Sequence, residues 1–180
     1  MSSTAQSATP KKAMTWVIKK VQVVGGKTYV LVGTDQASNP YNGDTLITER
    51  RSLLCIKKDP QLYQNPGSLV PAPTVTPGGA NTNTWSNSKV MVIPNVLGSS
   101  LISQADADMK CGIVGQLIHG ISGFRMAEFH DGTGSNPGWT FWAEAHSIVE
   151  GLAAQPLTSP DNSSVARYWV RINDQPANPW

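Results

Sequence analysis

The first third of the chain alternates β-branched runs with glycine and asparagine turns. Residues 15–24, TWVIKKVQVV, and residues 27–33, KTYVLVG, are two such runs, and two glycines join them. Two β-rich runs on either side of a glycine turn predict a β-hairpin. The run 45–58, TLITERRSLLCIKK, follows an Asn-Gly turn and predicts one or two more strands. The expected core residues of this antiparallel sheet are Val17, Val21, Val23, Tyr29, Leu31 and Leu54.

The clearest helical pattern covers residues 104–118. Ser103 precedes it and Asp106 lies three positions later, which resembles a capping box and predicts a helix start. Cys111 lies away from the main apolar line of this helix, which is compatible with a bridge to another element. Apolar side chains at i, i+4 spacing predict a buried stripe. That stripe consists of Ala105, Met109, Ile113 and Leu117.

The rest of the chain predicts shorter strands between ordered loops. Residues 59–79 contain five prolines, which exclude a central strand or a long helix there. Strands are expected near residues 90–93, over 139–146 with bulky groups on both faces, and after residue 166. The expected organisation is a flexible tail (1–13), an antiparallel β lobe (14–58), a Pro/Gly-rich connector (59–83) and a second lobe (84–180), or one compact domain over 14–180.

Composition supports a fold that is α+β but mostly β, with one main helix. Charged residues are only 14% of the chain, and it carries 16 Gly and 13 Pro, which favours strands, turns and ordered loops. No apolar run approaches the roughly 20 residues of a membrane span. The N-terminus lacks the apolar centre of a secretory signal, so we expect a cytoplasmic protein or export by a non-classical route.

The charge is divided unevenly between the two parts of the sequence. Residues 1–58 hold nine Lys/Arg and three Asp/Glu, a net +6, whereas residues 59–180 have a net −4. One interpretation is a chance distribution over the surface. The other is attraction between opposite halves, within the chain or head to tail in a homo-oligomer. The basic residues form separated pairs, so we expect no nucleic-acid partner.

The stretch FRMAEFHDG, residues 124–132, concentrates polar side chains among apolar ones. We expect Arg125, Glu128, His130 and Asp131 to form a structural network that satisfies buried groups of the fold. The alternatives are acid–base chemistry by a carboxylate–histidine pair, or a metal site. The metal site would combine the three histidines with two acids: His119, His130, His146, Glu128 and Asp131. The chain lacks hydrolase, nucleotide-binding and zinc-protease motifs, so an enzyme is the third choice.

Cys55 and Cys111 are the two cysteines of the chain. They form either one disulfide, which closes a loop of about 57 residues, or two separate buried thiols. Two cysteines alone do not build a zinc site.

Residues 95–180 resemble the C-type-lectin-like domains. The helix with SQADADMKC, the segment GFRMAEF, a long Gly/Asn/Pro loop and the Trp-rich GWTFWAE and RYWVRINDQ follow the family's order of elements. The resemblance implies a loop-rich lobe that binds ligand, often a sugar through calcium. The family's calcium motifs are not reproduced: IND precedes QPAN, no Trp directly precedes Asn173, and the family's cysteine pairs are missing. We therefore expect no cofactor, with calcium admitted only through the resemblance.

Tryptophans and amides gather near the C-terminus. They are typical of a buried aromatic core, and also of a platform for a glycan or a protein surface. The predicted ligand-binding residues are Trp139, Trp142, Asn136, Asn173, Asp174, Gln175 and Asn178. Two function classes follow: a non-enzymatic lectin-like binding module, and a self-associating structural subunit of an oligomer or filament.

Overall fold

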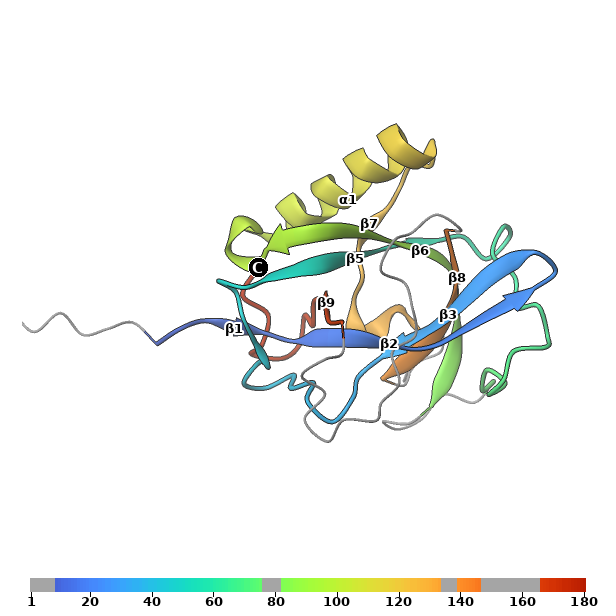
Figure 1. Cartoon of the computed structure of the whole chain (residues 1–180), viewed down its shortest axis with the longest axis horizontal. Coiled ribbons are helices and arrows are strands. Elements are labelled where there is room, and N and C mark those ends of the chain that lie inside the picture. Colours follow the sequence, from blue (N-terminus) through green and yellow to red (C-terminus); the bar gives the residue numbers. More distant parts are fainter. Residues whose placement is uncertain (1–8, 76–81, 134–138, 147–165) are drawn as a thin grey trace, which may run out of the picture.

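The computed structural model describes residues 9–75, 82–133, 139–146 and 166–180. These residues form a mostly β structure with one main helix, which confirms the predicted fold class (Figure 1). The strands are β1 (Lys12–Ala13), β2 (Thr15–Val24), β3 (Lys27–Gly33), β4 (Thr45–Leu46), β5 (Arg50–Lys58), β6 (Asn83–Leu97), β7 (Arg125–Met126), β8 (Thr140–Ala145) and β9 (Tyr168–Trp169). The helices are α1 (Gln104–His119) and two 3-10 turns, η1 (Gly98–Ser100) and η2 (Phe129–Asp131).

The predicted hairpin is β2 and β3, which pair antiparallel from Val24–Lys27 outward. Gly25 and Gly26 form its turn with φ angles of 57° and 77°. Both angles lie in the left-handed region, which matches the twist of the two strands and favours glycine. The core prediction for this region is wrong at Val23, which is 66% exposed because it lies near the end of the hairpin.

The main sheet has seven strands in the order β6-β8-β3-β2-β9-β5-β7 and also pairs β6 with β5, so it closes on itself. Most neighbours are antiparallel, but β6 pairs with β8, and β5 with β9, in parallel. The pairings β2–β9 and β3–β8 join the two ends of the sequence in one sheet. The small sheet pairs β1 with β4, so the last two residues of the expected tail are ordered against the body of the protein.

A buried cluster from almost every strand of the closed sheet forms the main core. Strand β8 separates this core from a second apolar layer, because Phe141 belongs to the main cluster and Trp142 to the second. Both side chains are fully buried, as expected of a strand with bulky groups on both faces. The main cluster includes Met14, Trp16, Ile18, Val30, Val32, Leu54, Ile56, Val90, Phe141, Tyr168, Val170 and Ile172.

Helix α1 lies outside the closed sheet, in contact with β5, β6 and β7 (Figure 1). It begins as predicted, because the Ser103 hydroxyl accepts a hydrogen bond from the Asp106 amide at 3.1 Å. No helix among the described residues is long and apolar enough to cross a membrane.

The prediction of the buried helix face is wrong. The residues that face the sheet are Ala107, Cys111 and Gly115. A Cβ atom on Gly115 would lie 2.5 Å from a ring carbon of Phe124, so glycine is what lets the helix approach this closely. Residues two positions apart lie on nearly opposite sides of a helix. The predicted stripe therefore faces outward.

Candidate functional site

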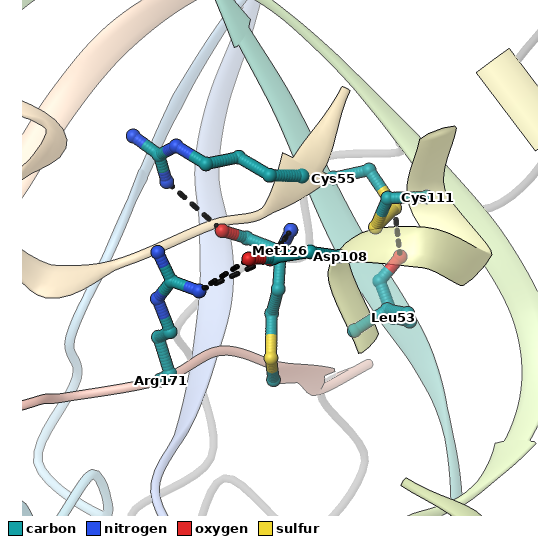
Figure 2. The surroundings of a disulfide bond; sticks show 7 residues. Leu53, Cys55, Asp108, Cys111, Met126 and Arg171 are labelled. Carbon is teal, nitrogen blue, oxygen red and sulfur yellow. Dashed lines mark hydrogen bonds and ion pairs between the residues drawn. A yellow bond between two sulfur atoms is a disulfide. The ribbon is translucent and has the colours of Figure 1, made fainter. Parts of the chain in front are cut away.

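Two attachments hold the inner face of α1 to the protein. Cys111 forms a disulfide with Cys55 of β5, with the two Cα atoms 5.6 Å apart. One turn earlier, both carboxylate oxygens of Asp108 accept hydrogen bonds from Arg171 Nη1 at 3.0 Å. Asp108 also accepts from the backbone amide of Met126 at 2.9 Å (Figure 2). The helix is thus fixed by a covalent bond and a charge-assisted network, both on one side.

The stretch 124–132 forms β7 and η2, so it combines a short strand with a helical turn. The Asp131 side chain is 2% exposed, and its carboxylate accepts hydrogen bonds from both terminal nitrogens of Arg125. Its Oδ2 also accepts from the Glu128 amide at 2.7 Å, and together the Glu128 and Asp131 side chains form a capping box around η2. Lys58 Nζ donates to the Asp131 carbonyl at 2.7 Å. These contacts join β7, η2 and the end of β5 in one hydrogen-bonded network.

The network reaches the surface at His130. The ring Nδ1 lies 2.7 Å from Glu128 Oε1, and Nε2 lies 3.4 Å from Asp174 Oδ2. The His130 ring also packs edge-on against the Phe129 ring, with centroids 4.6 Å apart. Phe129 in turn packs edge-on against Trp139, with centroids 4.5 Å apart. Contacts through Phe129 and His130 therefore connect the half-buried Trp139 indole to the exposed Asp174 carboxylate.

The structure buries one of the predicted ligand-binding residues and leaves five others at least partly exposed. Trp142 is fully buried and its Nε1 donates to the Pro71 carbonyl at 2.9 Å, so it cannot form a contact platform. The reason is that β8 buries both of its faces. Asn136 lies outside the described residues. Of the remaining five, Asn173 and Asp174 are exposed, and Trp139, Gln175 and Asn178 are partly buried.

The five-residue metal site suggested by the sequence does not assemble as one group. His130 contacts Glu128 and Asp174, whereas His119 and His146 lie against each other with ring centroids 4.0 Å apart. His119 ends α1, and His146 directly follows β8. Burial lowers the pKa of His146, and His119 and Lys89 lower it further. In the part of the chain that the structure describes, no three His, Cys, Asp or Glu side chains cluster as metal ligands.

A second buried ion pair was not predicted from the sequence. Arg167 donates to both oxygens of Asp35, at 2.9 and 2.8 Å, and both side chains are almost completely buried. Burial alone would raise the pKa of Asp35, but the Arg167 guanidinium and the hydrogen bonds from Ser38 together outweigh it, so the pKa is lowered. The pair joins residues 132 positions apart, so the sequence offers no local signal for it.

The outer face of α1 is the largest departure from the predicted surface. Met109 is 58% exposed, Ile113 51% and Leu117 76%. Ile102, before the helix, and Ile118 are also exposed. An apolar stripe at helical spacing that faces water is typical of an interaction surface. In the sequence, the orientation of the helix is indicated by Cys111, which lies off the stripe. Its disulfide holds the opposite face of the helix against the sheet.

Comparison with known proteins gives no relative: no family model, no curated protein and no solved structure matches this chain.

Proposed function

We propose that this chain is a non-enzymatic, self-associating module whose contact surface is the outer apolar face of α1. The observation that supports it is the stripe of Met109, Ile113 and Leu117, exposed on a helix whose inner face is already fixed to the protein. Removing such side chains from water is favourable, at about 25 cal/mol for each Å² of apolar surface.

A second copy is the occupant that suits this face. In an antiparallel pair with a twofold axis between Met109 and Ile113, each of these residues would face the other on the second copy. Ala105 would then face Leu117, a small side chain against a large one. The first turn of α1 contains Asp106 and the last turn contains His119. Antiparallel packing brings these opposite ends and the opposite helix dipoles together, which favours this orientation.

The contact area sets the expected affinity. A helix of 16 residues is about 24 Å long and about 10 Å wide, so one face offers roughly 240 Å² per copy. Stable protein interfaces bury about 800 Å² per partner. We therefore expect a weak dimer, with a dissociation constant of roughly 0.1–1 mM.

Sedimentation velocity between about 20 µM and 1 mM tests the proposal. The unmodified chain should shift from monomer to dimer, and the Ile113→Lys/Leu117→Lys variant should stay monomeric. Lysine is a good helix former, so the helix itself is retained. Leu62→Lys is the matched control, since Leu62 is 62% exposed but lies outside α1. A monomer at 1 mM, or a dimer that persists in the double variant, would refute the proposal.

Salt distinguishes this contact from an association of the basic half with the acidic half. An apolar helix contact should persist or strengthen at about 0.5 M NaCl, because salt screens charge and leaves apolar burial intact. Loss of the dimer at that salt concentration would favour the head-to-tail alternative instead.

A second candidate is glycan binding at the surface formed by Trp139, His130 and Asp174. The observation that favours it is the continuous contact from the Trp139 ring through Phe129 and His130 to an exposed carboxylate. An aromatic face beside polar groups suits a sugar ring. A glycan array with the unmodified chain and with Trp139→Ala tests it, with and without calcium. Absence of any Trp139-dependent signal would rule it out.

A further inference from the structure

The histidine pair joins two elements that are far apart in the sequence. His119 is the last residue of α1, and the backbone amide of His146 is held by the Val90 carbonyl of β6 at 3.1 Å. Both residues are partly exposed, so the pair lies at the surface of the protein. The Nδ1 atom of His146 is buried and has no hydrogen-bond partner among the described residues. A buried polar atom without a partner is uncommon and calls for a ligand or a water to satisfy it.

We propose that His119 and His146 form a two-imidazole site for a divalent transition metal, with Cu²⁺ or Ni²⁺ as the preferred ion. Neutral imidazole is the form that binds such metals, and solvent would supply the remaining ligands. The described part of the chain offers no third ligand side chain, so the site is open rather than a closed structural site.

The ring separation distinguishes between metals. A metal bound about 2.0–2.1 Å from an imidazole nitrogen lies about 3.2 Å from the ring centroid. Two ligands at 90° then have centroids about 4.5 Å apart, and two at the tetrahedral angle about 5.2 Å apart. The observed separation is 4.0 Å. The two rings would therefore have to move apart less for the 90° arrangement of Cu²⁺ and Ni²⁺ than for the tetrahedral arrangement of Zn²⁺.

The neighbouring charges restrict the ligand further. Lys89 lowers the pKa of His146 through its charge, and its Nζ lies 3.0 Å from Glu144 Oε1. Glu144 is shared with Lys27 at 2.9 Å, so its charge does not neutralise both lysines. A site with this positive surplus disfavours hard cations, which bind through charge and oxygen ligands. The repulsion acts on every divalent cation, and only a metal that forms strong bonds to imidazole can offset it.

Titration calorimetry of the full chain with Cu²⁺, Ni²⁺ and Zn²⁺ tests the site, together with electron paramagnetic resonance of the Cu²⁺ form. We expect one Cu²⁺ per chain with nitrogen coupling, and an affinity at least about tenfold lower in His119→Ala and in His146→Ala. His130→Ala is the matched control, because it removes the one other imidazole and should leave binding unchanged. Equal affinity in His119→Ala, or no binding to the unmodified chain, would overturn the proposal, and tighter binding of Zn²⁺ than of Cu²⁺ would overturn the choice of metal.

A thermal measurement gives a second readout that does not depend on calorimetric heat. Metal bound between the end of α1 and the end of β8 stabilises the folded state, by about 5–10 °C in melting temperature at 100 times the dissociation constant. The shift should occur in the unmodified chain and in His130→Ala. A shift of the same size in His119→Ala would show that the metal binds elsewhere.

Discussion

Replacing Arg125 with alanine should destabilise the protein by about 2–4 kcal/mol. The arginine supplies two hydrogen bonds to Asp131, whose carboxylate is 2% exposed. Without it, the carboxylate keeps the Glu128 amide as a donor but loses its bonded counter-charge. Breaking a buried pair in this way costs about 3–5 kcal/mol, and we lower the figure because the Arg125 side chain is 32% exposed.

Urea unfolding followed by tryptophan fluorescence measures this change. With a slope of about 2 kcal/mol per molar urea, the midpoint should fall by about 1–2 M. Arg51→Ala is the matched control, because Arg51 pairs with Glu49 at the surface, with exposures of 34% and 39%. A surface pair contributes at most about 1 kcal/mol, so this control should lose less than about 0.5 M.

One outcome of comparing Arg125→Ala with Arg51→Ala would refute this reasoning. If Arg125→Ala moves the midpoint no further than Arg51→Ala does, water or other groups satisfy Asp131 and the network is not a structural determinant. Asp131→Asn gives an independent check. It keeps the size of the side chain but removes the charge, and it should also lower the midpoint.

Three further changes test other parts of the fold. Cys111→Ser removes the disulfide across a sequence separation of 56 residues and should lower the free energy of unfolding by about 4 kcal/mol, which reduction of the unmodified chain should reproduce in the same urea assay. Gly115→Ala should destabilise because its Cβ would meet Phe124 at 2.5 Å, whereas Gly112→Ala, with its nearest neighbour at 3.5 Å, should stabilise by about 0.5–1 kcal/mol; equal effects would contradict the packing described for α1. The pKa of Asp35 is lowered in the folded state. The ionised carboxylate therefore contributes fully to stability above its unfolded pKa of about 3.9, and this contribution is lost as the pH falls through the lower folded pKa. Asp35→Asn should flatten the dependence of the urea midpoint on pH below about 4.

Elements specified by local chemistry could be predicted from the sequence. The hairpin of β2 and β3 follows from β-branched runs around two glycines, and α1 begins where Ser103 caps it. Both features depend on residues within a few positions of each other. The pairings β2–β9 and β5–β9 depend on segments more than a hundred residues apart, and no local pattern specifies them.

The candidate sites divide along the same line. Asp131 lies six residues from Arg125, so the local sequence could indicate their contact. Trp142 was misplaced because alternation indicates two faces of a strand but not that both are covered. The His119–His146 contact needs the end of the helix to meet the end of β8, which only the tertiary structure provides.

The way α1 is attached explains why its apolar stripe faces water and not the core. Four apolar residues at helical spacing normally face a core because their burial is the largest available gain. Here the disulfide at Cys111, the Asp108 network and the close approach at Gly115 fix the opposite face inward. The stripe is therefore displayed on a rigid helix, and a partner that binds it does not have to order the helix first. Because Ile113 and Leu117 are more than half exposed, we expect substitutions there to change association more than stability, which substitutions in a buried stripe would not.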